Sequence, residues 1–347
     1  MALSASGAIS AGDIRTEYGL SGAVSFGDLY RGGTNVRAKA ANNTGVNLAS
    51  SVPTSGAITF GNFRGTAKGF RYTFTAGATN QNASALFGSD YGVNYPKEIV
   101  IDSGVELGAT STAEEALEID SGGAGTITVT NNGTLSGAGG AAGADGGDAF
   151  EAAVACTFVN NGTVRAGGGG GGVGGDGSYQ STTSNTQCVF YCTKTVRASG
   201  GKMSYHWQSS SICNNYLARV HCNVTTITSG GATYTKGSAC GTGTDPCDIG
   251  GTIKDYNRIT RSVTSTTNTT GGIGGVGTGY NQSSGTGVAG GTNAGTGGNG
   301  GGFGASGSTG SNGNSTNGFS GGAAGKYLRG SSFVTFTNNG TALGGTA

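Results

Sequence analysis

The stretch TITVTNNGTL, residues 126–135, decides the fold because it recurs as TFVNNGTV at 157–164 and as VTFTNNGT at 334–341. Each copy alternates apolar and polar residues, as a half-buried β-strand does, and then reaches Asn-Gly, a strong tight-turn signal. A glycine run follows the first two copies, and Gly344-Gly345 follows the third. A simple β-hairpin does not need a run of glycines after its turn. The pattern therefore predicts successive layers or rungs, in which the three copies lie side by side.

The sequence around the first two copies predicts a β-rich module over residues 66–164. Further strands are expected at 71–75, 98–102 and 116–120. Cys156 precedes the second copy and is expected to be a small buried residue of a strand. Six acidic residues nearby could supply a carboxylate pair for glycan hydrolysis, but a solvated acidic face is the simpler interpretation. They are Asp102, Glu106, Glu114, Glu115, Glu118 and Asp120.

Glycine recurs at every third position in four tracts, at 137–146, 168–177, 271–277 and 298–313. A polyproline II helix has three residues per turn, so this spacing leaves one face of such a helix without side chains. Several helices can then pack backbone to backbone and exchange N–H···O bonds. We expect residues 165–178 and 263–347 to form a polyglycine II bundle with a C-terminal strand. The alternative is a flexible linker, which does not require the spacing.

The composition excludes several classes of protein. Glycine supplies 74 of 347 residues but proline only 3, so the chain is not collagen. Charged residues are 11% and the formal net charge is +1, which gives no basic field for nucleic acid. No apolar run reaches the ~18 residues that a transmembrane helix needs, so we expect no membrane insertion. The N-terminus shows no pattern of a signal peptide.

Residues 1–65 carry three copies of another short pattern, SGAISAGDI at 6–14, SGAVSFGDL at 21–29 and SGAITFGNF at 55–63. In each, Ser or Thr precedes Asp or Asn by three residues, as in a capping box at the start of a helix. Helices this short are marginal alone, so the segment is expected to attach to a larger partner. A self-contained helical cap is the alternative. The residues expected to carry attachment are Ile14, Leu29, Tyr30 and Phe63.

These motifs resemble known phage proteins. Residues 10–19 and 21–33 are similar to a segment of the tail proteins of tailed bacteriophages. The order of strand, Asn-Asn-Gly-Thr and glycine tract, with the closing run 321–344, resembles the glycine-rich receptor-binding adhesins at phage tail-fibre tips. The resemblance implies a rigid polyglycine II bundle, joining loops that bind the host receptor, and a place in the virion tail. It also implies other tail or fibre proteins as partners, with a homotrimer or a trimeric fibre as the assembly.

Residues 179–262 depart from that pattern as a cysteine-rich insertion. We expect disulfides, with zinc ligation and free thiols as the alternatives, and the sequence cannot choose among 15 pairings of six cysteines. Eight Lys or Arg against three Asp and several aromatic residues make this segment a candidate for binding a host protein or glycan. The alternative is that the aromatic residues form a small core. The cysteines are Cys188, Cys192, Cys213, Cys222, Cys240 and Cys247, and the receptor-binding candidates are Tyr191, Tyr205, His206, Trp207 and Tyr216.

The sequence thus predicts a mostly β and irregular protein with short N-terminal helices, a β-rich layered module, and a polyglycine II bundle that carries a disulfide-rich insertion. Motifs of common hydrolases and phosphate loops are missing, so we expect no enzyme, no cofactor and no metal. The expected function is that of a phage tail or tail-fibre-tip adhesin, made in the host cytoplasm and acting outside it. A purely structural tail-tip, baseplate or decoration protein is the alternative, and a tail-associated glycan hydrolase is a third class.

Overall fold

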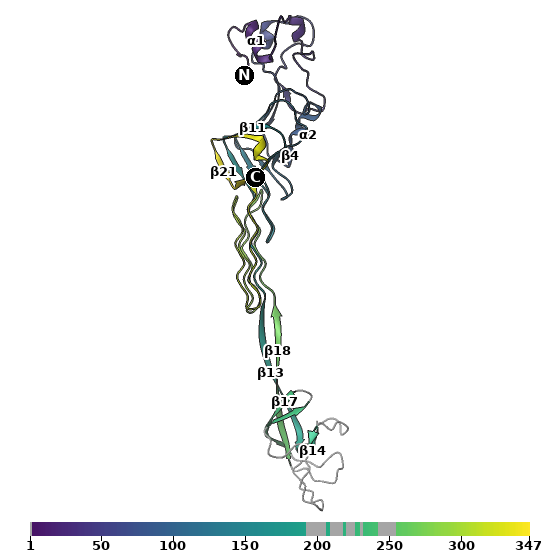
Figure 1. The fold of residues 1–347 in the computed structure, drawn as a ribbon, viewed down its shortest axis with the longest axis vertical. Coiled ribbons are helices and arrows are strands. Elements are labelled where there is room, and N and C mark those ends of the chain that lie inside the picture. The colour runs from purple at the N-terminus through teal and green to yellow at the C-terminus, as the bar shows by residue number, and fades with distance from the viewer. Residues whose placement is uncertain (1, 192–205, 209–217, 220–225, 230–231, 242–254) are drawn as a thin grey trace, which may run out of the picture. The chain divides into compact units, whose positions relative to one another are not determined.

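The computed structural model describes residues 2–191, 206–208, 218–219, 226–229, 232–241 and 255–347, drawn in Figure 1. Two compact units divide the chain: residues 1–178 with 269–347, and residues 179–268. The described residues are mostly β, with two short α-helices, α1 (Ala11–Tyr18) and α2 (Ala83–Phe87). This confirms the predicted class of mostly β and irregular structure.

The N-terminal repeats fold as the capping pattern predicts. Each starts a short helix, namely α1, η1 (Phe26–Leu29) and η2 (Phe60–Phe63). The backbone N–H of the capping residue donates to the side chain three residues on, at 2.7 Å for Ser10 and Asp13. Gly19 ends α1 in the left-handed conformation that glycine favours. The second helix ends at Leu29, because Tyr30 is already extended.

Three parallel sheets form the body that follows. The first holds the parallel strands β2 (Phe70–Phe74), β5 (Lys97–Ile101), β8 (Ile127–Asn131), β11 (Cys156–Asn160) and β20 (Val334–Asn338), and the short β1 (Val46–Asn47) pairs antiparallel with β2 at its edge. The second holds β3 (Ala78–Thr79), β6 (Glu106–Gly108), β9 (Thr134–Ser136), β12 (Thr163–Arg165) and β21 (Thr341–Leu343). The third holds β4 (Gln81–Asn82), β7 (Leu117–Ile119) and β10 (Phe150–Ala152). Each of the first three turns contributes one strand to each sheet in order, and the last two turns add strands to the first two sheets, so the body is a parallel β-helix.

The three Asn-Asn-Gly-Thr copies lie on consecutive rungs of this β-helix, as predicted. Strand β11 pairs in parallel register with β8 on one side and with β20 on the other. Their buried residues, such as Val129 and Phe158, face the interior, and Phe158 stacks on Phe150 with ring centroids 4.4 Å apart. Cys156 is buried in β11, which confirms its expected environment. The Asn-Gly turn is therefore a corner between two sheets and not a hairpin.

The glycine tracts are insertions at another corner, between the second and third sheets. The chain leaves β9 at residue 137 and returns at β10, and it leaves β12 at residue 166 and returns at β19 (Lys326–Leu328). The N–H of Ala149 donates to Lys326 and that of Arg329 to Phe150, so β19 takes its place beside β10. The short strand β22 (Gly345–Thr346) pairs with β19 on the next rung. We call the inserted residues 137–148, 166–178 and 270–325 the glycine body.

Segment 167–175 is the centre of the glycine body and bonds to neighbours in a period of three. Its N–H groups donate in turn to the segments 144–147, 272–278 and 305–311, with N···O distances of 2.7–3.0 Å. Its carbonyls accept from the segments 140–143, 295–301 and 319–325. A Cβ added at Gly170 would lie 1.7 Å from the carbonyl oxygen of Ala141, so no side chain fits there. Backbone contact on every side therefore explains the run of six glycines at 167–172.

Val173, the first residue of segment 167–175 that is not glycine, lies where a neighbouring segment ends. The segment beside Gly167 and Gly170 turns back at 141–144, so no segment among the described residues covers the equivalent side of Val173. The Val173 side chain is accordingly exposed. The end of one neighbouring segment thus determines where a side chain becomes possible.

The second unit is described in part. Its six-stranded sheet has the order β15-β14-β13-β18-β17-β16. The strands are β13 (Gly177–Tyr191), β14 (His206–Gln208), β15 (Ala218–Arg219), β16 (Thr226–Ser229), β17 (Ala232–Gly241) and β18 (Asp255–Thr269). Strands β13 and β18 are the ones through which the chain leaves and rejoins the glycine body.

Candidate functional sites

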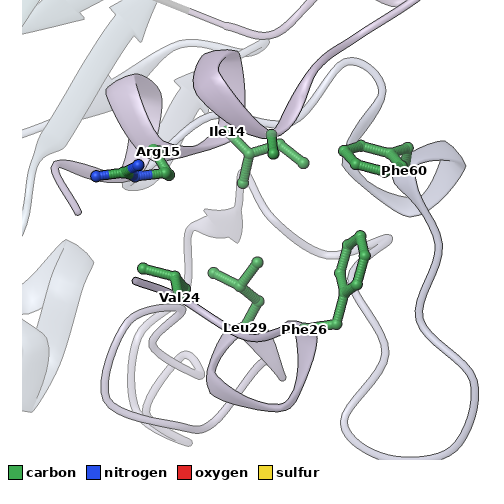
Figure 2. Close-up of a pocket in the computed structure, with 7 residues that line it drawn as sticks. Ile14, Arg15, Val24, Phe26, Leu29 and Phe60 are labelled. Carbon is green, nitrogen blue, oxygen red and sulfur yellow. The ribbon is translucent and has the colours of Figure 1, made fainter. Parts of the chain in front are cut away.

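A small apolar pocket lies among the three N-terminal helices (Figure 2). Helix α1 contributes Ala11, Ile14 and Arg15, the second repeat contributes Val24, Phe26 and Leu29, and η2 contributes Phe60. The Phe26 and Phe60 rings meet edge to face with centroids 5.1 Å apart, yet their residues are 38% and 39% exposed. Two aromatic rings held together at the rim of an apolar pocket form a surface that can receive a partner's apolar side chain.

The four predicted attachment residues have different places in this module. Ile14, Leu29 and Phe63 are buried in its core, and the first two also line the pocket. Tyr30 is half-buried and its hydroxyl donates to the carbonyl of Gly56. Their part in attachment stays a prediction, but their burial shows that each also stabilises the module itself.

Phe26 and Phe60 were missed as candidates, although the repeats themselves carry the signal. They occupy the same position in the second and third copies, directly after the capping residue, where the first copy has Ala11. A residue just after a helix cap, on the first turn of a one-turn helix, cannot bury a large ring against its own helix. The repeat therefore places an aromatic ring at the surface twice.

The receptor-binding candidates lie in the second unit. Tyr191 is the last residue of β13 and stands opposite Trp207 of β14, while His206 stands opposite Arg219 of β15. The sheet thus brings two of the aromatic candidates to neighbouring strands. Tyr205 and Tyr216 lie outside the described residues.

The predicted disulfide framework lies in the same unit. Cys188 is in β13 and Cys240 in β17, while Cys192, Cys213, Cys222 and Cys247 lie outside the described residues. The disulfides therefore remain a prediction.

A cluster of half-buried acidic side chains lies at β10 and the residues just before β7 and β10. Arg329 Nη1 lies 3.2 Å from Glu115, 3.6 Å from Asp148 and 3.5 Å from Glu151. Burial and the neighbouring Glu151 raise the pKa of Glu115 to about 7. The expectation of a solvated face is wrong for Glu115, whose side chain is 10% exposed because the returning C-terminal segment brings Arg329 over it. The arrangement joins β19 to the β-helix.

Other potentially reactive groups in the described part of the chain show no sign of chemical activity. Burial raises the pKa of the Cys156 thiol to about 11, so it stays protonated and unreactive at neutral pH. No group of three or more His, Cys, Asp or Glu among the described residues is placed to hold a metal ion. No described helix has the length and apolar character to cross a bilayer.

Comparison with known proteins agrees with this picture of strands followed by glycine segments. The family model of the phage tail fibre adhesin Gp38 matches residues 69–347. The chain belongs to the Gp38 family of phage tail fibre adhesins. The matched residues include the β-helix, the glycine body and the second unit, and leave out the N-terminal helices. This adhesin is therefore a component of the virion tail, as the sequence predicted, and its family is one of adhesins and not of enzymes.

Two further comparisons complete the findings. A crystal structure of the gp37–gp38 adhesin tip complex of the bacteriophage S16 long tail fiber is similar over 85% of this chain and 88% of that chain. The sequence identity is 18% and the TM-score is 0.39. A search of curated proteins gave no match for the adhesin. The family membership rests on the match to residues 69–347.

Proposed function

We propose that this adhesin attaches to a tail fibre protein through its N-terminal helices and meets a host surface protein or glycan through residues 179–262. The observation that carries the proposal is the course of the chain. The second unit is inserted between two glycine segments, so the chain commits its whole β-helix and glycine body to presenting it. Adhesin function, which the family match shows, requires one surface that binds the virion and another that contacts the cell.

We further propose that the glycine body is a polyglycine II bundle. The support is the hydrogen bonding of segment 167–175, whose N–H groups address three neighbours in turn and whose carbonyls accept from three others. A helix with three residues per turn directs every third residue to the same side, which is the relation seen here. Such a bundle is stiff because each residue is held by backbone bonds to different neighbours.

The insertion begins and ends at a clasp within the first unit. The Gly271 N–H donates to Asp176 Oδ1 at 3.0 Å, and the side-chain amides of Asn293 and Asn314 donate to the Ser178 carbonyl at 3.0 and 2.8 Å. These bonds fix the exit and the return of the inserted chain side by side. In this proposal the aromatic candidates Tyr191, Tyr205, His206, Trp207 and Tyr216 contact the host, and the six cysteines are paired in disulfides that hold their loops.

Binding to host cells tests the receptor end of the proposal. The full chain is compared with a variant that lacks residues 180–262, and with the full-length double variant Tyr205→Ala and Trp207→Ala. We expect the deletion to abolish binding and the double variant to weaken it at least about tenfold, since aromatic residues carry much of an interface's energy. A Tyr179→Ala variant is the control. Equal binding by the deleted chain, with its thermal unfolding intact, would place the receptor site elsewhere.

Incorporation into the virion tests the other end. The double variant Phe26→Asp and Phe60→Asp places two charges at the pocket rim, where both rings are already exposed. We expect the purified protein to fold and the number of adhesin copies per tail to fall. Phe319→Asp, which changes an exposed ring of the glycine body, is the matched control. Normal copy number in the double variant would refute attachment through the pocket, whether the assembly is a homotrimer or a trimeric fibre.

A further inference from the structure

The last rung of the β-helix is open. Strands β20 and β21 each end the order of their sheet, and in the described part of the chain no strand pairs with their outer edges. Asn160, on the rung before, is fully buried, whereas its equivalent Asn338 is exposed. Gly340 and Leu343 are exposed as well, and the inward-facing Phe336 is half-buried where Phe158 is buried. The rung thus has the surface of an interior layer without the layer that would cover it.

The side chains of the Asn-Asn corner form two hydrogen-bonded ladders that stop at this rung. In the inner ladder, Asn131 Nδ2 donates to Asn160 Oδ1 at 2.8 Å, and Asn160 Nδ2 donates to Asn338 Oδ1 at 2.7 Å. Among the described residues, Asn338 Nδ2 has no acceptor of its own. The Asn160 amide also reaches the carbonyl of Thr341, one rung ahead, at 3.1 Å. The next acceptors of the ladder would be an Asn and a Thr carbonyl of a further rung.

The outer ladder runs in the opposite direction. Asn339 Nδ2 donates to Asn161 Oδ1 at 3.0 Å, and Asn161 Nδ2 donates to Asn132 Oδ1 at 2.9 Å. The open rung therefore offers an amide donor at Asn338 and an amide acceptor at Asn339. A surface that offers both at adjacent positions is complementary to another Asn-Asn pair in the same register.

The backbone at the corner also specifies its neighbour. The Asn339 N–H donates to the Asn160 carbonyl at 2.7 Å and the Thr341 N–H to the Gly162 carbonyl at 2.8 Å. By the same relation, the carbonyls of Asn338 and Gly340 are the next acceptors. A Cβ added at Gly340 would lie 2.0 Å from the Gly162 oxygen, and one at Gly162 would lie 2.1 Å from the Gly133 oxygen. The residue that follows on Gly340 must accordingly be glycine.

As far as the chain is described, the open edge of β20 and β21 carries none of the features that protect exposed strands from pairing. Native edge strands are usually protected by a charge, a proline, a bulge or a covering segment. The sequence VTFTN of β20 has no charge and no proline, and it pairs with β11 without a register shift. An unprotected edge of this kind is suited to receive a strand from another chain, with backbone bonds giving affinity and side-chain seats giving specificity.

We propose that the open rung is an interaction surface that receives one further rung from a neighbouring tail protein. The incoming segment is a strand, an Asn-Asn-Gly-Thr corner and a second strand, added parallel to β20 and β21 and in register with them. A second molecule of this chain fits less well. Its first two Asn-Asn-Gly-Thr motifs lie inside its own β-helix and are not free to pair. Its third copy would meet β20 across a two-fold axis and run antiparallel, which would misalign the corner.

Amide hydrogen exchange of the complete adhesin, free and in assembled tails, tests the proposal directly. We expect peptides covering residues 334–343 to exchange at least about tenfold more slowly in tails than in the free protein, since exchange of an edge amide requires no opening until a strand covers it. Residues 308–318 of the glycine body, which the proposal leaves uncovered, are the internal control. Equal rates for residues 334–343 in both samples would overturn the proposal.

A synthetic peptide with the sequence of residues 154–165, VACTFVNNGTVR, tests whether the open rung recognises a strand with an Asn-Asn-Gly-Thr corner. The measurement is the anisotropy of the labelled peptide with the full-length protein. We expect binding that falls at least about tenfold when the peptide carries Val for its glycine, or when the protein carries Asn338→Leu and Asn339→Leu. Asn317→Leu, at another exposed position, is the control. Absence of binding, or equal binding by the Val peptide, would refute the corner as the recognition element, and self-association that the double variant abolishes would assign the seat to a second copy.

Discussion

The β-helix and the glycine body stabilise their chains in opposite ways. In the β-helix, apolar side chains such as Ile99, Val129 and Phe158 leave water together, and the backbone bonds only to the rungs on either side. In the glycine body, the central segment is glycine at every position except Val173, and its backbone bonds to neighbours all around. One region thus depends on what the side chains fill, and the other on their absence. A chain with only 34% hydrophobic residues can therefore form an ordered glycine body, because that part needs no apolar core.

We expect the largest loss of stability when a side chain is placed in the centre of the glycine body. Gly170→Val would place Cβ 1.7 Å from the Ala141 carbonyl oxygen, so two segments must separate and their hydrogen bonds are lost. We expect a loss of more than about 4 kcal/mol in the free energy of unfolding, or no folded protein. Denaturant unfolding measures it. Gly302→Ala, where a Cβ meets nothing within 4 Å, is the control, and equal stability of the two variants would contradict the close packing.

The β-helix should be destabilised by the opposite change, which is the removal of a buried side chain. Phe158→Ala removes a fully buried ring that contacts Phe150 and Phe336. We expect the free energy of unfolding to fall by about 3–5 kcal/mol. Phe333→Ala, at a ring that is 47% exposed, should change it by less than about 1 kcal/mol. Similar losses at both positions would show that the rungs are not held by the interior.

The Asn ladders test an intermediate case, in which buried side chains stabilise the β-helix through hydrogen bonds. Asn160→Ala leaves the buried Asn131 amide without one of its acceptors and removes two bonds to the last rung. We expect a loss of about 1–3 kcal/mol in unfolding free energy. Asn161→Ala, the exposed neighbour with its own ladder, should cost less than about 1 kcal/mol. A larger loss at Asn161 would reverse this assignment of inner and outer ladders.

The smallest effect concerns the junction of the two regions and depends on pH. The pKa of Glu115 is raised in the folded protein, so folding favours its protonated form, and this contribution is complete below the unfolded pKa near 4.5. It is lost as the pH rises through about 7. We expect Glu115→Gln to reduce the fall in melting temperature between pH 5 and pH 8, and Glu114→Gln, at an exposed position, to leave it unchanged. An unaltered pH profile in Glu115→Gln would show that Arg329 compensates the carboxylate fully.

Much of this fold could be predicted from local sequence. The Asn-Asn-Gly-Thr copies predicted adjacent rungs because identical side chains stack in register only when their strands are neighbours, and the capping residues predicted the three N-terminal helices. The strand β19 was not predicted, since its three residues carry no motif and their place is defined by β10, which lies far away in sequence. The exposed rings of Phe26 and Phe60 were missed because the attachment residues were chosen from other positions of the repeats.

The course of the chain through the glycine body also determines the order in which the molecule can be completed. Segment 167–175 leaves the ribosome before residues 270–325, which supply four of the segments bonded to it. Strand β11 likewise gains its partner β20 only after more than 170 further residues have been made. Contacts at such sequence separation close slowly, because the loop entropy is lost before the contact forms. The central glycine segment therefore keeps many of its backbone donors and acceptors in water until residues 270–325 have been made. Residues 179–268 are synthesised before those bonding partners are available.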